Sequence, residues 1–198
     1  MSTAARSALD ANRLGALWAT LDRLMDAALP GQSRSSAAIL LTLRHRAPIN
    51  QIDLAAVVDL SQPACSRAVA RLVEQGVVAC RSGTGKAVEL RLSAAGRRQA
   101  DAMALRRLQA LGGLLGILSH TERAALNAIV DKLVAPPVSG HAYAHQVCRF
   151  CDHGICDGPA CPIGGAARVI AAASAADGAT LANRAVRSRS ARAPSRPR

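Results

Sequence analysis

Hydrophobic residues recur at helical spacing through the first part of the chain. In residues 5–29, apolar side chains repeat every three or four positions, which is the period of one face of an α-helix. The same period predicts a second helix over about 33–46 and a third over 50–58. Serine at the start of the second and Asn50 at the start of the third are typical helix caps.

The next segment changes from helical to strand-like patterning. Ser61 is expected to open a fourth helix that ends at Gly76, with Pro63 in its first turn. Residues 77–81 and 87–92 then have the β-branched or alternating composition of strands. A short glycine-containing turn separates them, so the two runs predict a hairpin.

Two further helices complete the regular part of the chain. Ser93 is expected to cap a long helix, and the capping box of residues 119–122 opens the last core helix. The expected inner face of that last helix is Leu126, Ile129, Val130 and Leu133. The predicted fold class is therefore mainly α with a small β-hairpin wing, that is, a winged helix-turn-helix.

Composition and charge restrict the function of the chain. It has 198 residues and a net charge of +12, from 25 Lys and Arg against 13 Asp and Glu. A surplus of this size favours a polyanionic partner, nucleic acid before membrane. The longest apolar stretch is too short to span a membrane, and the N-terminus lacks the apolar run of a signal peptide. We therefore expect no membrane association and a cytoplasmic location.

The fourth helix and the hairpin have the residues of a DNA-reading unit. Gln62, Ser66, Arg67 and Arg71 lie outside the apolar stripe of the helix, where Gln can pair with adenine and Arg with guanine in the major groove. Cations on the hairpin would contact phosphates. The predicted DNA-contacting residues are Ser61, Gln62, Pro63, Ser66, Arg67, Arg71, Arg81, Lys86 and Arg91.

These residues also carry a resemblance to a known family. The motif Leu-Ser-Gln-Pro-Ala-Cys-Ser-Arg at 60–67, Gly-Val-Val at 76–78, Leu-Arg-Leu-Ser-Ala-Ala-Gly at 90–96 and the capping box at 119–122 resemble the MarR family of bacterial transcription regulators. The resemblance covers roughly residues 10–135. One departure is the wing, which lacks the family's usual Asp-x-Arg and has Lys86 as its only tip cation.

The resemblance implies more than the residues show by themselves. The family's fold implies a homodimer formed by the first helix and the last two helices, with each protomer offering one recognition helix to a palindromic site. It also implies repression by occupying a promoter, and a small-molecule effector in the cleft between the dimer and DNA-binding parts.

The predicted organisation of the whole chain is as follows: a dimerisation helix at 1–32, a DNA-binding domain at 33–92, dimerisation helices at 93–136, a cysteine-rich metal-binding segment at 137–164 and a basic tail at 165–198.

Four of the six cysteines have the spacing C-x2-C-x4-C-x4-C: Cys148, Cys151, Cys156 and Cys161. Four thiolates can surround one tetrahedral ion, and the spacing equals that of a zinc knuckle with Cys156 in place of its histidine. The spacing also suits an iron–sulfur cluster, since Pro162 follows the last cysteine as in bacterial ferredoxins. The sequence therefore predicts a metal site that holds zinc or an iron–sulfur cluster.

The sequence also allows interpretations in which these residues bind no metal. The cysteines could be free thiols or reversible disulfides, although clustering in a cytoplasmic chain argues against both. His141, His145 and His153 flank the cysteines as candidate further ligands, but a lone histidine is more often a surface residue. Cys65 lies on the expected buried side of the fourth helix and is read as a small core residue.

The C-terminal tail has a composition of its own. Residues 165–198 hold seven arginines and one aspartate, which is half of the net charge. Residues 165–176 are alanine-rich and could form a helix. From about Gly178 the chain has almost nothing to bury, so the tail is expected to be largely disordered. Such a tail would either add nonspecific phosphate affinity or have no function.

The sequence as a whole predicts a sequence-specific, DNA-binding transcription regulator, a repressor that acts as a homodimer. The alternative is a metal-stabilised winged-helix module for protein interaction that binds DNA only nonspecifically. An enzyme is not expected, because the chain has no Gly-rich phosphate loop, no Ser-His-Asp arrangement and no HExxH motif. A four-cysteine site would also leave zinc no open position for catalysis.

Overall fold

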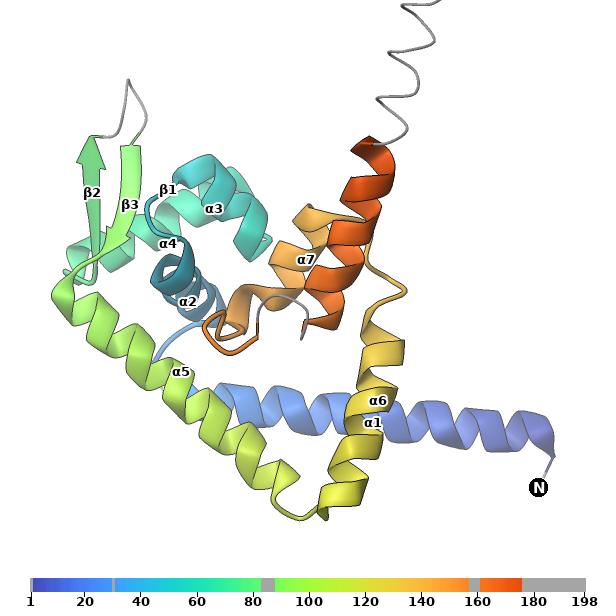
Figure 1. Cartoon of the computed structure of the whole chain (residues 1–198). Coiled ribbons are helices and arrows are strands. Elements are labelled where there is room, and N and C mark those ends of the chain that lie inside the picture. Colours follow the sequence, from blue (N-terminus) through green and yellow to red (C-terminus); the bar gives the residue numbers. More distant parts are fainter. Residues whose placement is uncertain (1, 30, 83–87, 157–160, 176–198) are drawn as a thin grey trace, which may run out of the picture.

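The computed structural model describes residues 2–29, 31–82, 88–156 and 161–175 (Figure 1). The wing tip with Lys86 and the tail from residue 176 lie outside the described residues. No helix of the described part is long and apolar enough to cross a membrane. In chain order the elements are α1 (Thr3–Ala28), α2 (Arg34–Arg46), β1 (Ile49–Asn50), α3 (Gln51–Val58), α4 (Gln62–Glu74), β2 (Val78–Ser82), β3 (Val88–Leu92), α5 (Ala94–Leu115), α6 (His120–Val134), α7 (His141–Val147), the 3₁₀ turn η1 (Cys148–Phe150) and a helix over 162–175.

The helix starts follow from local side-chain capping, as the sequence predicts. The side chains of Ser33, Asn50, Ser61 and Ser93 each accept a hydrogen bond from a backbone N–H in the first turn of their helix. At Ser119 the reciprocal capping box with its glutamate is complete. The boundaries of α2 to α6 are therefore set by short-range hydrogen bonds, which is why the sequence alone indicates them.

The sheet has three antiparallel strands in the order β1-β3-β2. Leu90 at the centre of β3 pairs with Cys80 on one side and with Ile49 on the other. The sequence predicts the β2–β3 hairpin but not β1, because a strand of two residues has no detectable alternation. Strand β1 joins the start of α3 to the wing and so fixes the wing against the helices.

The main core surrounds α2. Residues Ala37 to Leu43 are all buried, so this helix is covered on every side. It packs against α3, α4, α5, β3 and η1. The largest fully buried side chains are aliphatic or sulfur-containing: Ile39, Leu40, Leu41, Leu43, Leu54, Leu72, Leu90, Met103 and Cys65. An aliphatic core agrees with a sequence in which only 2% of the residues are aromatic.

A second, smaller core joins α7 to the helix over 162–175. It consists of Val138, Ala144 and Ala167, with Ile163 and Ile170 packed against them. The helical segment expected in the alanine-rich region is confirmed, and it begins at residue 162. Because α7 lies just before the first two cysteines and this helix lies just after the last, the small core brings the ends of the cysteine segment together.

The long helices leave much of their apolar surface uncovered. In α6 no residue is buried, and Leu133 is 56% exposed. In α1, which projects well beyond the sheet and its helices in Figure 1, Trp18 is 69% exposed. The predicted inner face of α6 is therefore wrong for the single chain, since within the described residues no other element packs extensively on this helix.

We predict that Gly96→Ala destabilises the fold, whereas Gly112→Ala in the same helix does not. A Cβ at Gly96 would lie 1.9 Å from the backbone oxygen of Val77, but at Gly112 it would meet nothing within 4 Å. The expected loss at Gly96 is about 1–3 kcal/mol, and Gly112→Ala should gain up to about 1 kcal/mol. Urea unfolding followed by circular dichroism measures both, and equal stabilities would contradict the tight junction of α5 with β2.

Candidate functional site

The recognition helix α4 is amphipathic, with its apolar side fixed to the core. Cys65, Val69 and Leu72 are buried against the other helices, so the core position predicted for Cys65 is confirmed. A tight turn holds α4 at an angle to α3, since Asp59 adopts a left-handed conformation (φ 57°) and the Leu60 N–H donates to the carbonyl of Ala55. This packing leaves the opposite side of α4 facing outward.

The outward side carries the predicted DNA-contacting residues. Among those within the described part, all are exposed: Ser61, Gln62, Pro63, Ser66, Arg67, Arg71, Arg81 and Arg91. Arg67 and Arg71 make no hydrogen bond or ion pair with another described residue. Arg91, by contrast, is paired with Glu89 at 3.2 Å. The two α4 arginines, like Arg81 of β2, are therefore exposed cations without a partner among the described residues.

A small concave site adjoins these arginines. A cavity of about 200 Å³ lies between the N-terminus of α2 and α4, and both Arg67 and Arg71 line it. Ser33, Ser35 and Ser36 line the other side. Hydroxyl groups and guanidinium groups are common donors to DNA phosphates, so the cavity extends the polar face of α4 toward α2.

The structure arranges the four cysteines of the C-terminal segment around the end of α7. The 3₁₀ turn η1 follows α7 directly and places Cys148 beside Cys151, whose N–H donates to the Cys148 carbonyl at 2.9 Å. Cys161 is buried at the start of the helix over 162–175, and its Sγ accepts a hydrogen bond from the N–H of Gly164 at 3.2 Å. Cys156 and Cys161 line the same cavity.

The histidines face the same space as the cysteines. A cavity of about 150 Å³ is lined by three of the cysteines and by all three histidines of this segment, together with Arg46 and Arg168. Among the described residues, however, no three Cys, His, Asp or Glu side chains converge as ligands of one ion. The segment therefore brings metal-binding residue types together without closing them around a single point.

Neighbouring groups shift the protonation of these thiols. The hydrogen bond with Cys148 lowers the pKa of Cys151 to about 6, and the nearby charge of Arg107 also lowers it. The same hydrogen bond and burial raise the pKa of Cys148. The pKa of Cys156 is raised to about 11. Burial is the main cause, and the charge of Cys161 is the second. One thiol of the first pair is thus stabilised as a thiolate, the form that binds metals.

The cysteine segment is joined to the winged-helix domain by polar contacts. Arg44 at the end of α2 donates from Nε to Asp101 of α5 at 2.6 Å and from Nη1 to Asp152 at 3.2 Å. The ring of His153 is stacked on that of His45 at 5.0 Å. The sequence analysis missed these contacts because the partners are far apart in the chain and have no shared motif.

Apolar packing and a backbone contact add to this junction. Phe150 is partly buried and packs against the main core. The amide of Gln146 donates to the carbonyl oxygen of Ala56 in α3 at 3.2 Å. The segment predicted as a separate region at 137–164 thus rests on both helices that precede the recognition helix.

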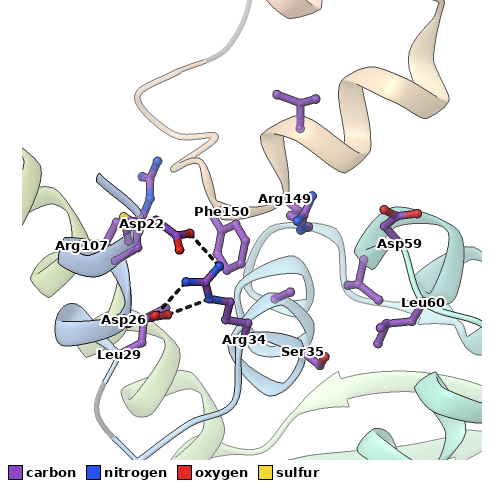
Figure 2. A pocket seen from close by; sticks show the side chains of 14 residues that line it. Asp22, Asp26, Leu29, Arg34, Ser35, Asp59, Leu60, Arg107, Arg149 and Phe150 are labelled. Carbon is purple, nitrogen blue, oxygen red and sulfur yellow. Dashed lines mark hydrogen bonds and ion pairs between the residues drawn. The ribbon is translucent and has the colours of Figure 1, made fainter. Parts of the chain in front are cut away.

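A further cavity lies between α1, α2 and this segment. Its volume is about 410 Å³. Figure 2 shows Arg34 of α2 pointing at two carboxylates of α1, with ion pairs of 2.7 Å to both Asp22 and Asp26. Arg149 and Phe150 of the cysteine segment line another side, with the Arg149 guanidinium 5.2 Å from the centre of the Phe150 ring.

The arrangement of α3, α4 and the β2–β3 wing defines a winged helix-turn-helix domain. Residues 34–79 match the family profile described as "Winged helix-turn-helix DNA-binding". No curated protein sequence matches the chain closely enough to be called a relative. The prediction that the chain is not an enzyme agrees with this class of domain.

Solved structures extend the similarity beyond that domain. The YusO protein from Bacillus subtilis has a TM-score of 0.59 at 18% identity, covering 67% of this chain and 97% of its own. MarR from E. coli has a TM-score of 0.54 at 20% identity, and the match covers 63% of this chain and 96% of MarR. MepR from Staphylococcus aureus has a TM-score of 0.53 at 15% identity, and the match covers 59% of this chain and 93% of MepR. The chain has the winged-helix fold of the MarR structures, as the sequence predicts.

We predict that Phe150→Ala destabilises the winged-helix domain, whereas Ile155→Ala does not. Phe150 packs on the main core, and Ile155 of the same segment is 71% exposed. Truncation of a fully buried Phe to Ala lowers the free energy of unfolding by about 3–5 kcal/mol. Truncation of this partly buried ring should therefore lower it by about 1–3 kcal/mol. Urea unfolding of both variants is the measurement. No loss at Phe150 would mean that the segment is only loosely attached.

Proposed function

We propose that this protein is a transcription regulator that binds double-stranded DNA as a homodimer and represses by occupying a palindromic operator. The observation that carries the proposal is the outward face of α4, where Arg67 and Arg71 are exposed without partners among the described residues. A helix with such a face fits the major groove, where arginine can read guanine. The net charge of +12 favours the same partner.

The similar structures support the regulatory part of the proposal. MepR is described as a transcription regulator of a multidrug efflux pump in its own organism, and it has the same fold as this chain. Fold alone does not fix function, so the polar face of α4 is the feature that links the two. We expect the protein to act in the cytoplasm, where the chromosome is accessible.

The uncovered apolar surface supports the homodimer. Leu14 and Trp18 of α1, Leu115 of α5 and Leu133 of α6 are all exposed in the single chain. A large exposed apolar patch on a monomer is typical of an interaction site, and we infer that these helices form one. A two-fold dimer built through these helices would present two copies of α4, so that an operator with half-sites about one DNA turn apart would bind both.

The regulatory inputs are proposed at two places. The cavity of about 410 Å³ between α1, α2 and the cysteine segment is a site for a small-molecule effector. Cys148, Cys151, Cys156 and Cys161 are proposed to hold zinc or an iron–sulfur cluster. Support comes from the N–H donated to the Cys161 sulfur and from the electrostatic interactions that link the four thiols.

We predict that Arg67→Ala weakens specific DNA binding by about 1–3 kcal/mol, which is about 5- to 150-fold. The operator is first selected from a pool of random duplexes, and fluorescence anisotropy then gives Kd for the selected duplex and for random DNA. Arg13→Ala removes the same charge from an exposed position of α1 and should leave the ratio of the two Kd values unchanged.

The outcome separates base reading from general attraction. Equal losses on the selected and the random duplex would show that Arg67 contacts phosphates only. Failure of the selection to enrich any sequence would favour the alternative function, a winged-helix module for protein interaction with nonspecific DNA binding.

We predict that Leu133→Glu converts the dimer to a monomer. The substitution places a charge in the uncovered apolar face of α6, where burial in a dimer would be costly. Ile52→Glu on α3 is the matched control, because Ile52 is 64% exposed but lies outside the proposed dimer helices. Sedimentation velocity measures the mass of each. A monomeric unsubstituted chain, or a Leu133→Glu variant that stays dimeric, argues against this interface.

A further inference from the structure

The small cavity between α2 and α4 is lined by hydrogen-bond donors and by no acidic residue. Its polar lining consists of Arg67 and Arg71 on the α4 side and of Ser33, Ser35 and Ser36 at the start of α2. The other lining residues are alanine and leucine. Its volume of about 200 Å³ admits a group of several atoms, since one water molecule takes about 30 Å³ in the liquid. Two guanidinium groups with no carboxylate in the same wall favour an anion.

The α4 wall is open because short side chains separate its two arginines. Ala64, Arg67, Ala68 and Arg71 follow one another at intervals of three or four residues, which places them on one face of the helix. The alanines leave room between the long side chains. Neither guanidinium group has a partner among the described residues, so this wall carries two positive charges that the protein does not compensate there.

The hydroxyl groups on the α2 side are arranged as donors. The Ser33 hydroxyl accepts the Ser36 N–H at 3.1 Å and donates to the Ser36 Oγ at 3.0 Å. Because the Ser36 oxygen already accepts this bond, its own proton is left to donate to a further group. The Ser35 hydroxyl makes no hydrogen bond with another described residue. The start of α2 therefore offers two hydroxyl donors to the cavity that the two arginines line.

A third arginine at the same end of α2 is already paired within the protein. Arg34 forms ion pairs of 2.7 Å with both Asp22 and Asp26 of α1. It lines the cavity on the α1 side and not the one beside α4. The charge of Arg34 thus holds α1 against α2, whereas the charges of the two α4 arginines face an unfilled polar space.

This cavity adjoins the face of α4 that is proposed to enter the major groove. In helix-turn-helix proteins the N-terminal residues of the recognition helix contact base edges, and Arg67 lies one turn nearer that end than Arg71. The DNA backbone borders the groove, and arginine and serine side chains are common donors to its phosphates. Because α2 is buried along Ala37 to Leu43 and packs on α4, the two walls of the cavity are held in place before DNA arrives.

We propose that Ser36 of α2 and Arg71 of α4 bind one backbone phosphate of the DNA between them, with Ser35 as a further donor. The inference deepens the proposed function and rests on its DNA binding. A phosphate contact carries no sequence information, but it fixes the register and orientation of the protein on the duplex. The site therefore sets how α4 enters the groove, while Arg67 is the residue that reads a base.

Substitutions on the two walls test the site. Arg71→Ala should weaken binding to the selected and the random duplex equally, by about 10-fold or more, because a charge-assisted hydrogen bond is lost. It should also lower the slope of log K against log salt by about 1, and Arg71→Lys should restore that slope by keeping the charge. Ser36→Ala should weaken both duplexes by about 2- to 10-fold at an unchanged slope. It keeps the helix cap, since Ser33 bonds to the backbone of residue 36.

The double variant tests whether the two side chains hold the same phosphate. Combined Ser36→Ala and Arg71→Ala should cost less than the product of the two single losses, because partners of one group are not additive. Arg13→Ala on α1 is the charge-matched control and should leave the salt slope unchanged. Circular dichroism shows that each variant is folded. Unchanged affinity in folded Arg71→Ala, a larger loss on the selected duplex than on random DNA, or a double loss equal to the product overturns the site.

A free anion is the other source of the same chemistry. The amide NMR signals of Ser36 and Arg71 are followed during addition of random duplex, and separately of sodium phosphate at constant ionic strength. We expect shifts with the duplex and none with phosphate. Shifts with phosphate, together with duplex binding that neither variant weakens, would indicate a site for inorganic phosphate and overturn the DNA assignment.

The same measurements separate this inference from the regulator function. If no operator sequence is enriched but both variants still weaken binding to random DNA, the phosphate site is supported and the sequence-specific regulator is contradicted. If an operator is enriched and neither variant weakens binding, the regulator is supported and the phosphate site is overturned. An unsubstituted chain that binds no duplex at low salt overturns both.

Discussion

The burial of α2 is the constraint on which the rest of the structure depends. Seven consecutive residues of this helix, Ala37 to Leu43, are removed from solvent, so every neighbour must supply an apolar face. Helices α3, α4 and α5, strand β3 and the turn η1 all pack on it. Burial of this much aliphatic surface is the main favourable term in folding. The recognition helix and the cysteine segment therefore share one support.

That shared support gives a physical route between the cysteine segment and the DNA-binding surface. Arg44 at the end of α2 binds Asp101 of α5 and Asp152 of the cysteine segment at once. Phe150 of the same segment also packs against the main core, so a displacement of the segment would disturb both contacts. Coupling of two sites requires such a physical connection together with a difference in affinity between two states. The structure supplies the connection at α2.

The large cavity is bounded by both parts of the molecule. Arg34 and its carboxylate partners on α1 form one side, and Arg149 with Phe150 forms another. An occupant would therefore touch a helix of the proposed dimer interface, the central helix α2 and the cysteine segment.

The local elements and the recognition face were determined by the sequence, because they depend on neighbours in the chain. Caps such as Ser61 and Ser93, the period of α4 and the exposed position of Arg67 all arise within one or two turns. The four-cysteine motif was likewise visible in its spacing. Strand β1 was not, because two residues carry no period and the strand exists only through its pairing with β3.

Tertiary structure alone decided how the pieces meet. The bridge from Arg44 to Asp101 and Asp152 joins residues separated by 57 and 108 positions, and no local pattern specifies such a pair. The exposure of Leu133 in α6 was also hidden, since an apolar stripe shows that a surface is to be covered but not whether its own chain covers it. The burial of Cys161 was also hidden, because it depends on the packing of the helix over 162–175 against α7, which spacing in the chain cannot encode.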